Sequence, residues 1–459
     1  MAVRFCSILI SMVAVLNCFK LFGQITPGNL VNITRDGSVG SIVIVARAQD
    51  EFMASWVSTS GVPFAGISND LGKGWILDNL GDVDVTSTWV AGNDDRFVVS
   101  YQKSPTANLG NVYARSSPYH RNVWTSSRLL GGGDVAEPLV GACANQLGFV
   151  VSWWDFTGEA SYVNFSTDGI TWNGAEEISI NRDTNTPVMV AASNSGFMAA
   201  WQELNGLNVN GYVSYSADGI TWGTPQLVSG MINLRGGNVI TIGATDAGFM
   251  LAWVDALQVI YTSFSRDQGA TWTSPVILSR NLTSQCESPI VSLAGNSTDF
   301  IASWVGYSGE ALASLSSNNG ETWEEPVILN SGANIATNGS EYSTVGVSVF
   351  NSNAMFTWQD SDSNAISCYA SLYLQPVRNL SGSRVLNQFF SLAEYVNVVS
   401  WSSSLSDITG YAIYRNGECI ALVPPSQLTY EDHDQSGSVT YEVVAVNGIY
   451  ESSPESITL

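Results

Sequence analysis

An apolar segment ending near an aromatic residue recurs seven times along the chain at a nearly constant interval. Five copies read FMASWV, FVVSWW, FMAAWQ, FMLAWV and FIASWV, and FVVSYQ and AMFTWQ are two variants. The aromatic markers are 45, 52, 48, 52, 51 and 54 positions apart and are Trp56, Tyr101, Trp153, Trp201, Trp253, Trp304 and Trp358. A period near 50 residues is typical of propellers and solenoids. Most of the 459 residues are therefore expected to form one repeat domain.

Each repeat unit contains four short segments with strand character, separated by turn residues. In one unit they are PVMVAAS from Pro187, GFMAAWQ from Gly196, GYVSYS from Gly211 and TPQLVS from Thr224. Four such strands form one blade of a β-propeller. The fold class is therefore expected to be all-β.

The seventh unit supplies only three strands, at 345–350, 354–359 and 365–372. The N-terminal segment 26–34, TPGNLVNIT, resembles the fourth-strand segments TPQLVS and SPVILS of other units. We therefore expect a seven-bladed propeller over residues 24–375, in which the N-terminal strand closes the last blade.

A second motif lies between the marker strands and fits Ser-x-Asp-x-Gly-x-x-Trp at 68–75 and 265–272. Copies at 166–172 and 216–222 are one residue shorter, and a degraded copy spans 116–124. The motif resembles the Asp box of the sialidase superfamily. An Asp or Asn side chain accepts hydrogen bonds from turn amides, and Gly tolerates the positive φ of a tight turn. A structural role is expected for the box residues Asp70, Asp168, Asp218, Asp267 and Asn318.

From Pro376 the period stops, and residues 376–459 have a different spacing. This segment resembles a fibronectin type III domain in VVSW, ending at Trp401, followed by ITGYAIYRNG and YEVVAVN. The resemblance implies a β-sandwich in which Trp401 is core and Tyr441 is a corner tyrosine. Such modules usually act as spacers or adhesion units.

The N-terminal residues are typical of an export signal, because Arg4 precedes a short apolar run from Phe5 to Leu16. A signal peptide over 1–23 is expected, with lipid anchoring at Cys18 as an open variant. No later stretch reaches the roughly 20 apolar residues that a membrane span requires, so none is expected in the mature chain. The sequence therefore predicts a secreted or cell-surface protein.

The formal net charge is −23, with a pI near 4.2. Repulsion between like charges argues against nucleic acid or anionic lipid as a partner and leaves neutral glycans, cationic surfaces and proteins open. The four cysteines beyond the signal are spread too widely for a disulfide framework or a closely spaced zinc motif.

Active members of the sialidase superfamily carry an arginine triad, a Tyr-Glu nucleophile pair, an acidic proton donor and often an early Arg-Ile-Pro motif. Arg-Ile-Pro is missing from this sequence, and the early Arg35 and Arg47 do not stand in the family's setting. No catalytic role of the family is therefore transferred to Arg35 or Arg47.

The resemblance places the pocket on the face built by the loops from strand four to the next strand one and from strand two to strand three. Charged residues in these loops could form an anion-binding clamp, because guanidinium groups bind carboxylates bidentately. The clamp candidates are Arg35, Arg182, Arg235 and Arg280, with Glu137 and Glu287 as acid–base candidates. The sequence predicts no cofactor. If calcium binds on this face, the first candidates for its oxygen ligands are Asp155, Asp255 and Asp360. Asp82 and Glu203 lie in the same loops, and all these charges are also compatible with ordinary solvated loops.

The sequence favours an exported recognition or adhesion protein whose propeller loops bind a glycan or a protein without catalysis. An exo-sialidase type of glycoside hydrolase is the alternative, and another propeller enzyme such as a polysaccharide lyase is a third class. Convergence of several arginines and a carboxylate pair on one central pocket would distinguish them.

Overall fold

The computed structural model describes the chain from residue 25 onward, with gaps. The described residues are 25–34, 36–106, 109–119, 123–133, 140–155, 158–180, 186–205, 208–228, 239–279, 288–296, 299–306, 308–330, 335, 342–373, 376–389, 392–403, 408–433, 437–447 and 450–459.

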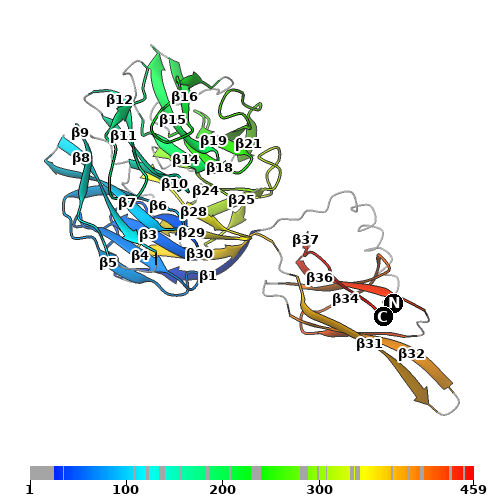
Figure 1. The fold of residues 1–459 in the computed structure, drawn as a ribbon. Coiled ribbons are helices and arrows are strands. Elements are labelled where there is room, and N and C mark those ends of the chain that lie inside the picture. The colour runs from blue at the N-terminus through cyan, green and yellow to red at the C-terminus, as the bar shows by residue number, and fades with distance from the viewer. Residues whose placement is uncertain are drawn as a thin grey trace. The chain divides into compact units, whose positions relative to one another are not determined.

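The chain divides into two compact units, Pro27–Ala370 and a second that includes Ser371–Leu459. Both are built from strands (Figure 1), and the described residues contain no helix. Consequently, no helix in this part of the chain could cross a membrane.

Seven four-stranded sheets make up most of the described first unit. We number them in chain order. Sheet 1 contains β2 (Ile44–Ala48), β3 (Glu51–Val57), β4 (Pro63–Ser68) and β5 (Ile76–Asn79). Sheet 2 contains β6 (Val85–Gly92), β7 (Arg96–Thr106), β8 (Leu109–Pro118) and β9 (Arg128–Gly133). Sheet 3 contains β10 (Val140–Asn145), β11 (Gly148–Asp155), β12 (Ala160–Ser166) and β13 (Glu176–Glu177).

The remaining sheets repeat this order of strands. Sheet 4 contains β14 (Met189–Ser193), β15 (Gly196–Asn205), β16 (Asn208–Ser216) and β17 (Gln226–Leu227). Sheet 5 contains β18 (Thr241–Thr245), β19 (Gly248–Val254), β20 (Ile260–Ser265) and β21 (Val276–Ser279). Sheet 6 contains β23 (Ser292–Gly295), β24 (Phe300–Val305), β25 (Ala311–Ser316) and β26 (Val327–Ile328). Sheet 7 contains β28 (Gly346–Phe350), β29 (Asn353–Gln359), β30 (Ala365–Ser371) and β1 (Thr26–Asn32). A short parallel pair, β22 (Ser288–Pro289) with β27 (Tyr342–Ser343), joins the chain ahead of sheets 6 and 7.

The sheets close into a ring through their first strands. Contacts run from β2 to β6, β10, β14, β18, β23 and β28 in turn, and β28 contacts β2 again. Radially arranged four-stranded sheets of this kind define a β-propeller. The first unit is a β-propeller (Figure 1).

Two kinds of contact join sheet 7 to the start of the chain. Strand β1 pairs with β30, and the Ile33 amide donates to the Ala365 carbonyl at 2.7 Å. The Thr357 hydroxyl donates to the carbonyl of Val43, ahead of β2, at 3.0 Å. The hydroxyl of Ser303 in sheet 6 makes the equivalent bond to the carbonyl of Val345, ahead of β28 in sheet 7. The last sheet is therefore attached to the first through the same kind of bond as an interior pair of sheets.

The aromatic markers lie on the second strand of each sheet, where they are fully buried. Five of them stack on an aromatic residue directly opposite on the third strand, with ring centroids 5.8–6.2 Å apart. The pairs are Trp56 with Phe64, Tyr101 with Tyr113, Trp153 with Tyr162, Trp201 with Tyr212 and Trp253 with Tyr261. Such cross-strand pairs stabilise a sheet, which explains the recurring aromatic position in the sequence.

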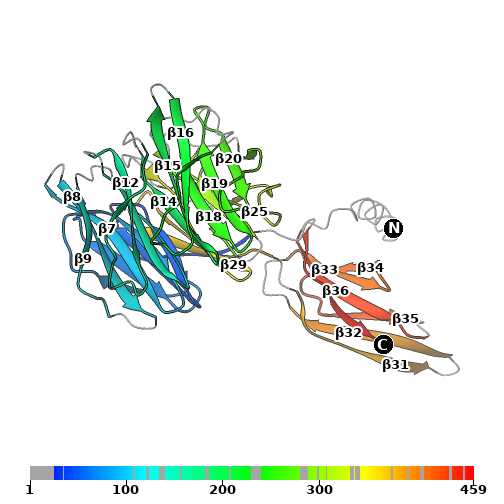
Figure 2. The same cartoon turned by 45° about the horizontal axis from the view of Figure 1, so that its top comes forward.

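The second unit contains two sheets around one core (Figure 2). One sheet has the order β31 (Arg378–Phe389), β32 (Leu392–Ser402), β35 (Thr429–His433). The other has the order β34 (Glu418–Val423), β33 (Gly410–Arg415), β36 (Thr440–Asn447), β37 (Tyr450–Glu451), with β38 (Glu455–Thr458) also paired to β36. Trp401 is buried against Tyr411, with ring centroids 5.4 Å apart.

Tyr441 is buried in this core, and its hydroxyl bonds to side chains of the other sheet. It donates to Oδ2 of Asp432 at 2.6 Å and accepts from Nδ2 of Asn397 at 3.0 Å. Arg415 Nη1 contacts both carboxylate oxygens of Asp432 at 3.2 Å. This buried network joins the two sheets of the second unit.

Candidate functional site

The antiparallel strands of each propeller sheet give the ring two distinct faces. The turns between strands one and two and between strands three and four lie at one end of a sheet, and the remaining connections lie at the other. We call the first the Asp-box face, because it carries the 68–75 motif and its copies, and the second the loop face.

The six candidates for ligand binding on the loop face all fall outside the described residues. They are Arg35, Arg182, Arg235, Arg280, Glu137 and Glu287. The anion clamp and the acid–base pair therefore stay predictions. The predicted signal peptide over 1–23, including Cys18, also falls outside the described residues.

The three suspected calcium ligands on the loop face cap their own turns. Asp255 Oδ1 accepts the amides of Leu257 at 2.8 Å and Val259 at 2.9 Å. Asp360 Oδ1 likewise accepts the amides of Asp362 and Asn364, and Asp155 Oδ1 accepts the amide of Gly158. Within the described parts of the chain, no group of three or more His, Cys, Asp or Glu residues is arranged to hold a metal ion. The positions of these aspartates are thus accounted for by turn bonding.

Glu203 occupies the equivalent position in sheet 4, two residues after its marker. Its side chain is buried, and Oε1 accepts from the Trp201 indole and from the Ile180 amide, both at 2.9 Å. Ile180 follows β13, so this carboxylate joins the end of sheet 3 to sheet 4. The corresponding indole N–H groups of Trp253, Trp304 and Trp358 are buried without a hydrogen-bond partner in the described structure. In sheet 4 Glu203 therefore accepts from the indole N–H of the marker, whereas the same group in sheets 5, 6 and 7 has no acceptor among the described residues.

Asp82 forms the most highly charged cluster of the described loop face. Oδ2 accepts from the Tyr101 hydroxyl at 2.5 Å and from Arg115 Nε at 3.0 Å, and Oδ1 lies 3.3 Å from Lys103 Nζ. Burial opposes the charged form of Asp82, but the Tyr101 hydrogen bond and the Arg115 charge outweigh it, so the pKa of Asp82 is lowered. Burial and the bond to Asp82 raise the pKa of Tyr101.

This cluster attaches the connection between sheets 1 and 2 to sheet 2, because Asp82 lies between β5 and β6 while Lys103 and Arg115 lie on β7 and β8. Tyr101 is the one tyrosine among the seven markers, and its hydroxyl, which can both donate and accept, is buried with Asp82 as its partner. The Asp82 cluster thus fixes this connection to sheet 2. The tyrosine at a position where the other markers are tryptophan was the one indication of this cluster in the sequence. Nothing in the sequence around Lys103 or Arg115 indicated that they take part in it.

On the Asp-box face the five box residues bond to their own turns. Asp70 Oδ1 accepts the amide of Gly74, and Asp267 Oδ1 accepts the amide of Thr271. Asp168, Asp218 and Asn318 make the same type of bond. The bonds from Thr271 lower the pKa of Asp267.

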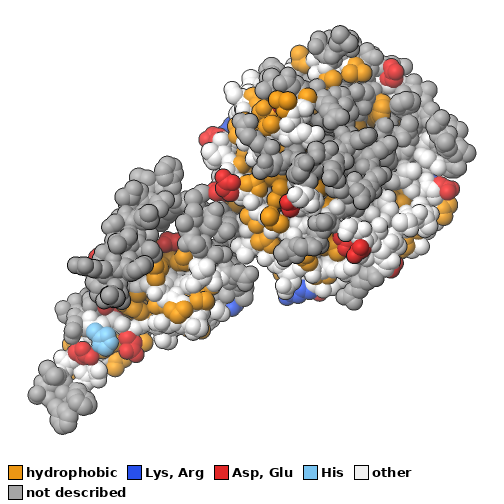
Figure 3. All heavy atoms as spheres, turned by 180° about the vertical axis from the view of Figure 1, so that it is seen from behind, with side chains coloured by type: hydrophobic (Ala, Val, Ile, Leu, Met, Phe, Trp, Pro, Cys, Tyr) orange, Lys and Arg blue, Asp and Glu red, His pale blue; other side chains and the backbone are white. Residues whose placement is uncertain are grey.

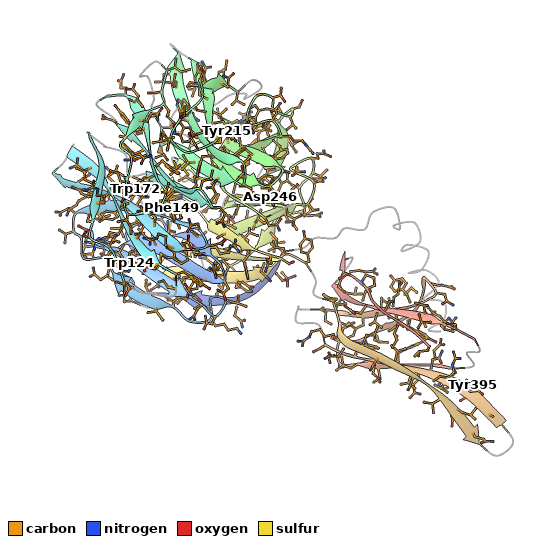
Figure 4. The ribbon with its side chains drawn as sticks, in the orientation of Figure 1. Trp124, Phe149, Trp172, Tyr215, Asp246 and Tyr395 are labelled. Atoms are coloured by element: carbon orange, nitrogen blue, oxygen red, sulfur yellow. The ribbon has the colours of Figure 1, made fainter. Side chains whose placement is uncertain are left out.

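Three of the box tryptophans donate a hydrogen bond to the preceding sheet (Figure 4 labels one of them, Trp124). Trp124 Nε1 donates to Asp78 of sheet 1 at 3.0 Å, and Trp323 Nε1 donates to Thr262 of sheet 5 at 3.0 Å. Trp75 Nε1 donates to Ser367 of sheet 7 at 3.1 Å, across the closure of the ring. In these copies the box thus fixes a turn and also anchors its sheet to a neighbour, whereas the Trp272 indole donates to Gly269 of its own turn.

Asparagines in the first turns form a second set of links on the Asp-box face, which the sequence analysis missed. Asn145 Oδ1 caps its own turn by accepting the Leu147 amide at 2.8 Å, and Nδ2 donates to the Ser193 carbonyl of the next sheet at 2.8 Å. Asn93 and Asn296 make both bonds in the same way. One side chain therefore joins two sheets.

Replacing Asn145 with aspartate should lower the free energy of unfolding by about 1–2 kcal/mol, since the turn cap is kept while a carboxylate faces the Ser193 carbonyl. Urea unfolding at neutral pH would measure the change. Gln226→Ala, on an exposed outer strand, is the control and should change stability little. An Asn145→Asp protein as stable as the unmodified one would show that the link contributes nothing.

Comparison with known proteins leaves the family of this chain open. No protein-family model and no curated protein matches the sequence. Similar solved structures include the Trypanosoma rangeli sialidase, at 9% identity and a TM-score of 0.41, covering 92% of this chain and 84% of that one. The fucose-specific lectin of Aleuria aurantia has 13% identity and a TM-score of 0.39, over 52% of this chain and 78% of that one. The β-propeller domain of the trilobed protease of Pyrococcus furiosus has 6% identity and a TM-score of 0.43, over 80% and 98%.

Proposed function

We propose that this chain is an exported recognition protein, secreted or held at the cell surface, whose propeller loops bind a glycan or a protein without catalysis. In this proposal the seven sheets are the blades of a sialidase-like Asp-box propeller spanning 24–375. Residues 376–459 form a fibronectin type III-like spacer or adhesion unit, and residues 1–23 are a signal peptide.

The carboxylates described on the loop face are the observation that carries the proposal. Glycoside hydrolysis requires two carboxylates across a pocket, one able to donate a proton. Asp155, Asp255 and Asp360 accept amides of their own turns, Glu203 accepts an indole and an amide, and Asp82 is paired with cations. Carboxylates in these roles support the scaffold, which favours binding by the loops over acid–base chemistry.

Charge narrows the class of ligand. A net charge of −23 opposes the approach of polyanions over long distances. Arginines in the loops can still bind a single carboxylate at close range, because their planar groups donate two parallel hydrogen bonds. Neutral glycans and glycans with an isolated acidic sugar are therefore the ligands that this surface suits best.

A glycan array probed with the purified protein tests the proposal, beside hydrolysis of a fluorogenic sialoside. We expect binding to a subset of glycans, a loss of that binding in an Arg182→Ala, Arg235→Ala double variant, and no turnover. Arg266→Ala is the matched control, because this arginine is exposed on the Asp-box face and pairs only weakly with Glu321 at 3.8 Å. Sialoside turnover that the double variant abolishes and the control keeps would replace the proposal with an exo-sialidase.

A further inference from the structure

The hairpin of β31 and β32 extends beyond the sheet to which it belongs (Figure 1). The two strands pair as far as Phe389 with Leu392, whereas β35 pairs with β32 only between Val396 and Ser400. We call residues Val385–Phe389 and Leu392–Tyr395 the arm. Along the arm the hairpin has two strands and no third strand beside it in the described structure. An isolated two-stranded ribbon of this kind is marginally stable in water.

The face of the arm that continues the core of the second unit is uncovered. Side chains alternate between faces along a strand, so Tyr395 lies on the same face as Asn397 and Val399, which are both fully buried. Leu386, opposite Tyr395, follows Arg384 on that face. Leu386 and Tyr395 are each 50% exposed (Figure 4 labels Tyr395). The side chains that face the core thus continue for one more cross-strand pair, Leu386 with Tyr395, beyond the part of the hairpin that the opposite sheet covers.

The outer edge of the arm is unprotected. Strand β31 is the outermost strand of its sheet, so its backbone groups along the arm face no neighbouring strand among the described residues. Edge strands are normally protected by charged side chains, proline or a bulge. The sequence VLNQF of Val385–Phe389 contains neither charge nor proline, and the one register shift of this hairpin lies further back, between Arg378 and Ser381.

We infer that the arm binds the arm of a second copy of this chain, with β31 antiparallel to β31 around a two-fold axis. Identical antiparallel edges can pair with such symmetry, so the inference needs no other surface. The pairing would join two ribbons into one four-stranded sheet and bring both Leu386–Tyr395 pairs onto a single apolar face. This interface is independent of the ligand proposed for the propeller.

The charges around the arm favour a copy of the same chain over a charged partner. From Val385 to Ala393 the sequence has no ionisable side chain, in a chain with a net charge of −23. The first carboxylate after this stretch of the sequence, Glu394, lies on the opposite face of the ribbon, 3.2 Å from His433 Nδ1 (Figure 3 shows an imidazole between carboxylates on the second unit). Two arms can therefore meet without placing like charges directly opposite each other.

The same net charge predicts the salt dependence of the association. Two chains of charge −23 repel each other at long range, and added salt screens this repulsion, so the dimer should become stronger as salt rises. An interface formed by ion pairs would show the opposite trend.

Sedimentation velocity of the purified protein over a range of concentrations and of sodium chloride tests the inference. We expect a reversible monomer–dimer equilibrium in which Leu386→Glu raises the dissociation constant by about tenfold or more, because it places carboxylates across the two-fold axis. Leu422→Glu is the matched control, since Leu422 is 52% exposed on β34 of the same unit. It should leave the equilibrium unchanged.

A cysteine at Asn387 provides a second readout that does not depend on the stability of a charged variant. Asn387 lies at the centre of Val385–Phe389, so Asn387→Cys should form an intermolecular disulfide under mild oxidation much faster than Leu422→Cys. A protein that stays monomeric at every concentration, or a dimer that keeps its dissociation constant in Leu386→Glu, would overturn the inference. Equal cross-linking at the two positions would overturn it as well.

Discussion

Replacing Asp82 with alanine should lower the free energy of unfolding of the propeller by about 3 kcal/mol, because it removes one partner from a partly buried ion pair. The side chain of Asp82 is 11% exposed and that of Arg115 is 18% exposed, with Arg115 Nη2 2.9 Å from Oδ2. Without the carboxylate, Arg115 and Lys103 lose their shared counter-ion, and the buried hydroxyl of Tyr101 loses its charged acceptor and keeps the Ser127 hydroxyl as a partner. Urea unfolding followed by tryptophan fluorescence would measure the loss.

A double-mutant cycle separates the unpaired charge from general damage. The variant with both Asp82→Ala and Arg115→Leu should be less destabilised than the sum of the single changes, since no arginine is then left unpaired. Asp362→Ala, an exposed aspartate in another loop, is the control. Additive single changes would contradict our account of this cluster.

Acid should reduce the effect of the Asp82 substitution. The pKa of Asp82 is lowered in the folded protein, so its contribution is present above the ordinary carboxyl value and is lost as the pH falls through the lowered value. The difference in stability between the unmodified protein and Asp82→Ala should accordingly shrink below about pH 4.

Replacing Asp432 with alanine should destabilise the second unit by a similar amount, about 3 kcal/mol. Asp432 is 8% exposed and accepts bonds from Arg415 and from the fully buried Tyr441. Its removal leaves a guanidinium and a buried hydroxyl without their acceptor. Hydrogen exchange of peptides from 376–459 is the appropriate measurement, because it reports on this unit while the propeller stays folded.

Alkaline pH gives a second test of the same network. Burial and the bond to Asp432 raise the pKa of Tyr441 to about 12. The hydroxyl therefore contributes stability that is complete below the ordinary tyrosine value near 10 and is lost as the pH rises toward 12. The Tyr441→Phe variant should not lose this part of its stability as the pH rises. An identical dependence of stability on pH in the variant and the unmodified protein would contradict the assignment.

Repeated sequence patterns correctly predicted the strands and the tight turns of the propeller sheets. The marker strands and box turns repeat because each sheet buries an aromatic pair and needs a fixed hairpin, so the same residues return in phase. The resemblance of 26–34 to other fourth strands predicted a strand there, and β1 (Thr26–Asn32) pairs with β30 in the structure. The aspartates that follow the marker strands were open to a better prediction, because the spacing of Asp255 to Leu257 and Val259 is that of a turn cap.

Contacts between residues far apart in the sequence could not be predicted in this way. Asn145 bonds to a carbonyl 48 positions away, and Arg115 reaches a carboxylate 33 positions away. Nothing in the residues next to either one indicates such a partner. The candidate ligand residues lie in connections outside the repeating pattern, where periodicity does not fix the conformation.

The pairing of β1 with β30 also sets when the ring can be completed during synthesis. The partner of β1, the first described strand, lies more than 300 residues later in the sequence, so the propeller cannot close until nearly all of it has been synthesised. Contacts at such sequence separation slow folding, and partial chains expose strand edges that invite aggregation. The described strands of the second unit begin at Arg378, a few residues after β30. This unit is therefore synthesised only after all the strands of the ring.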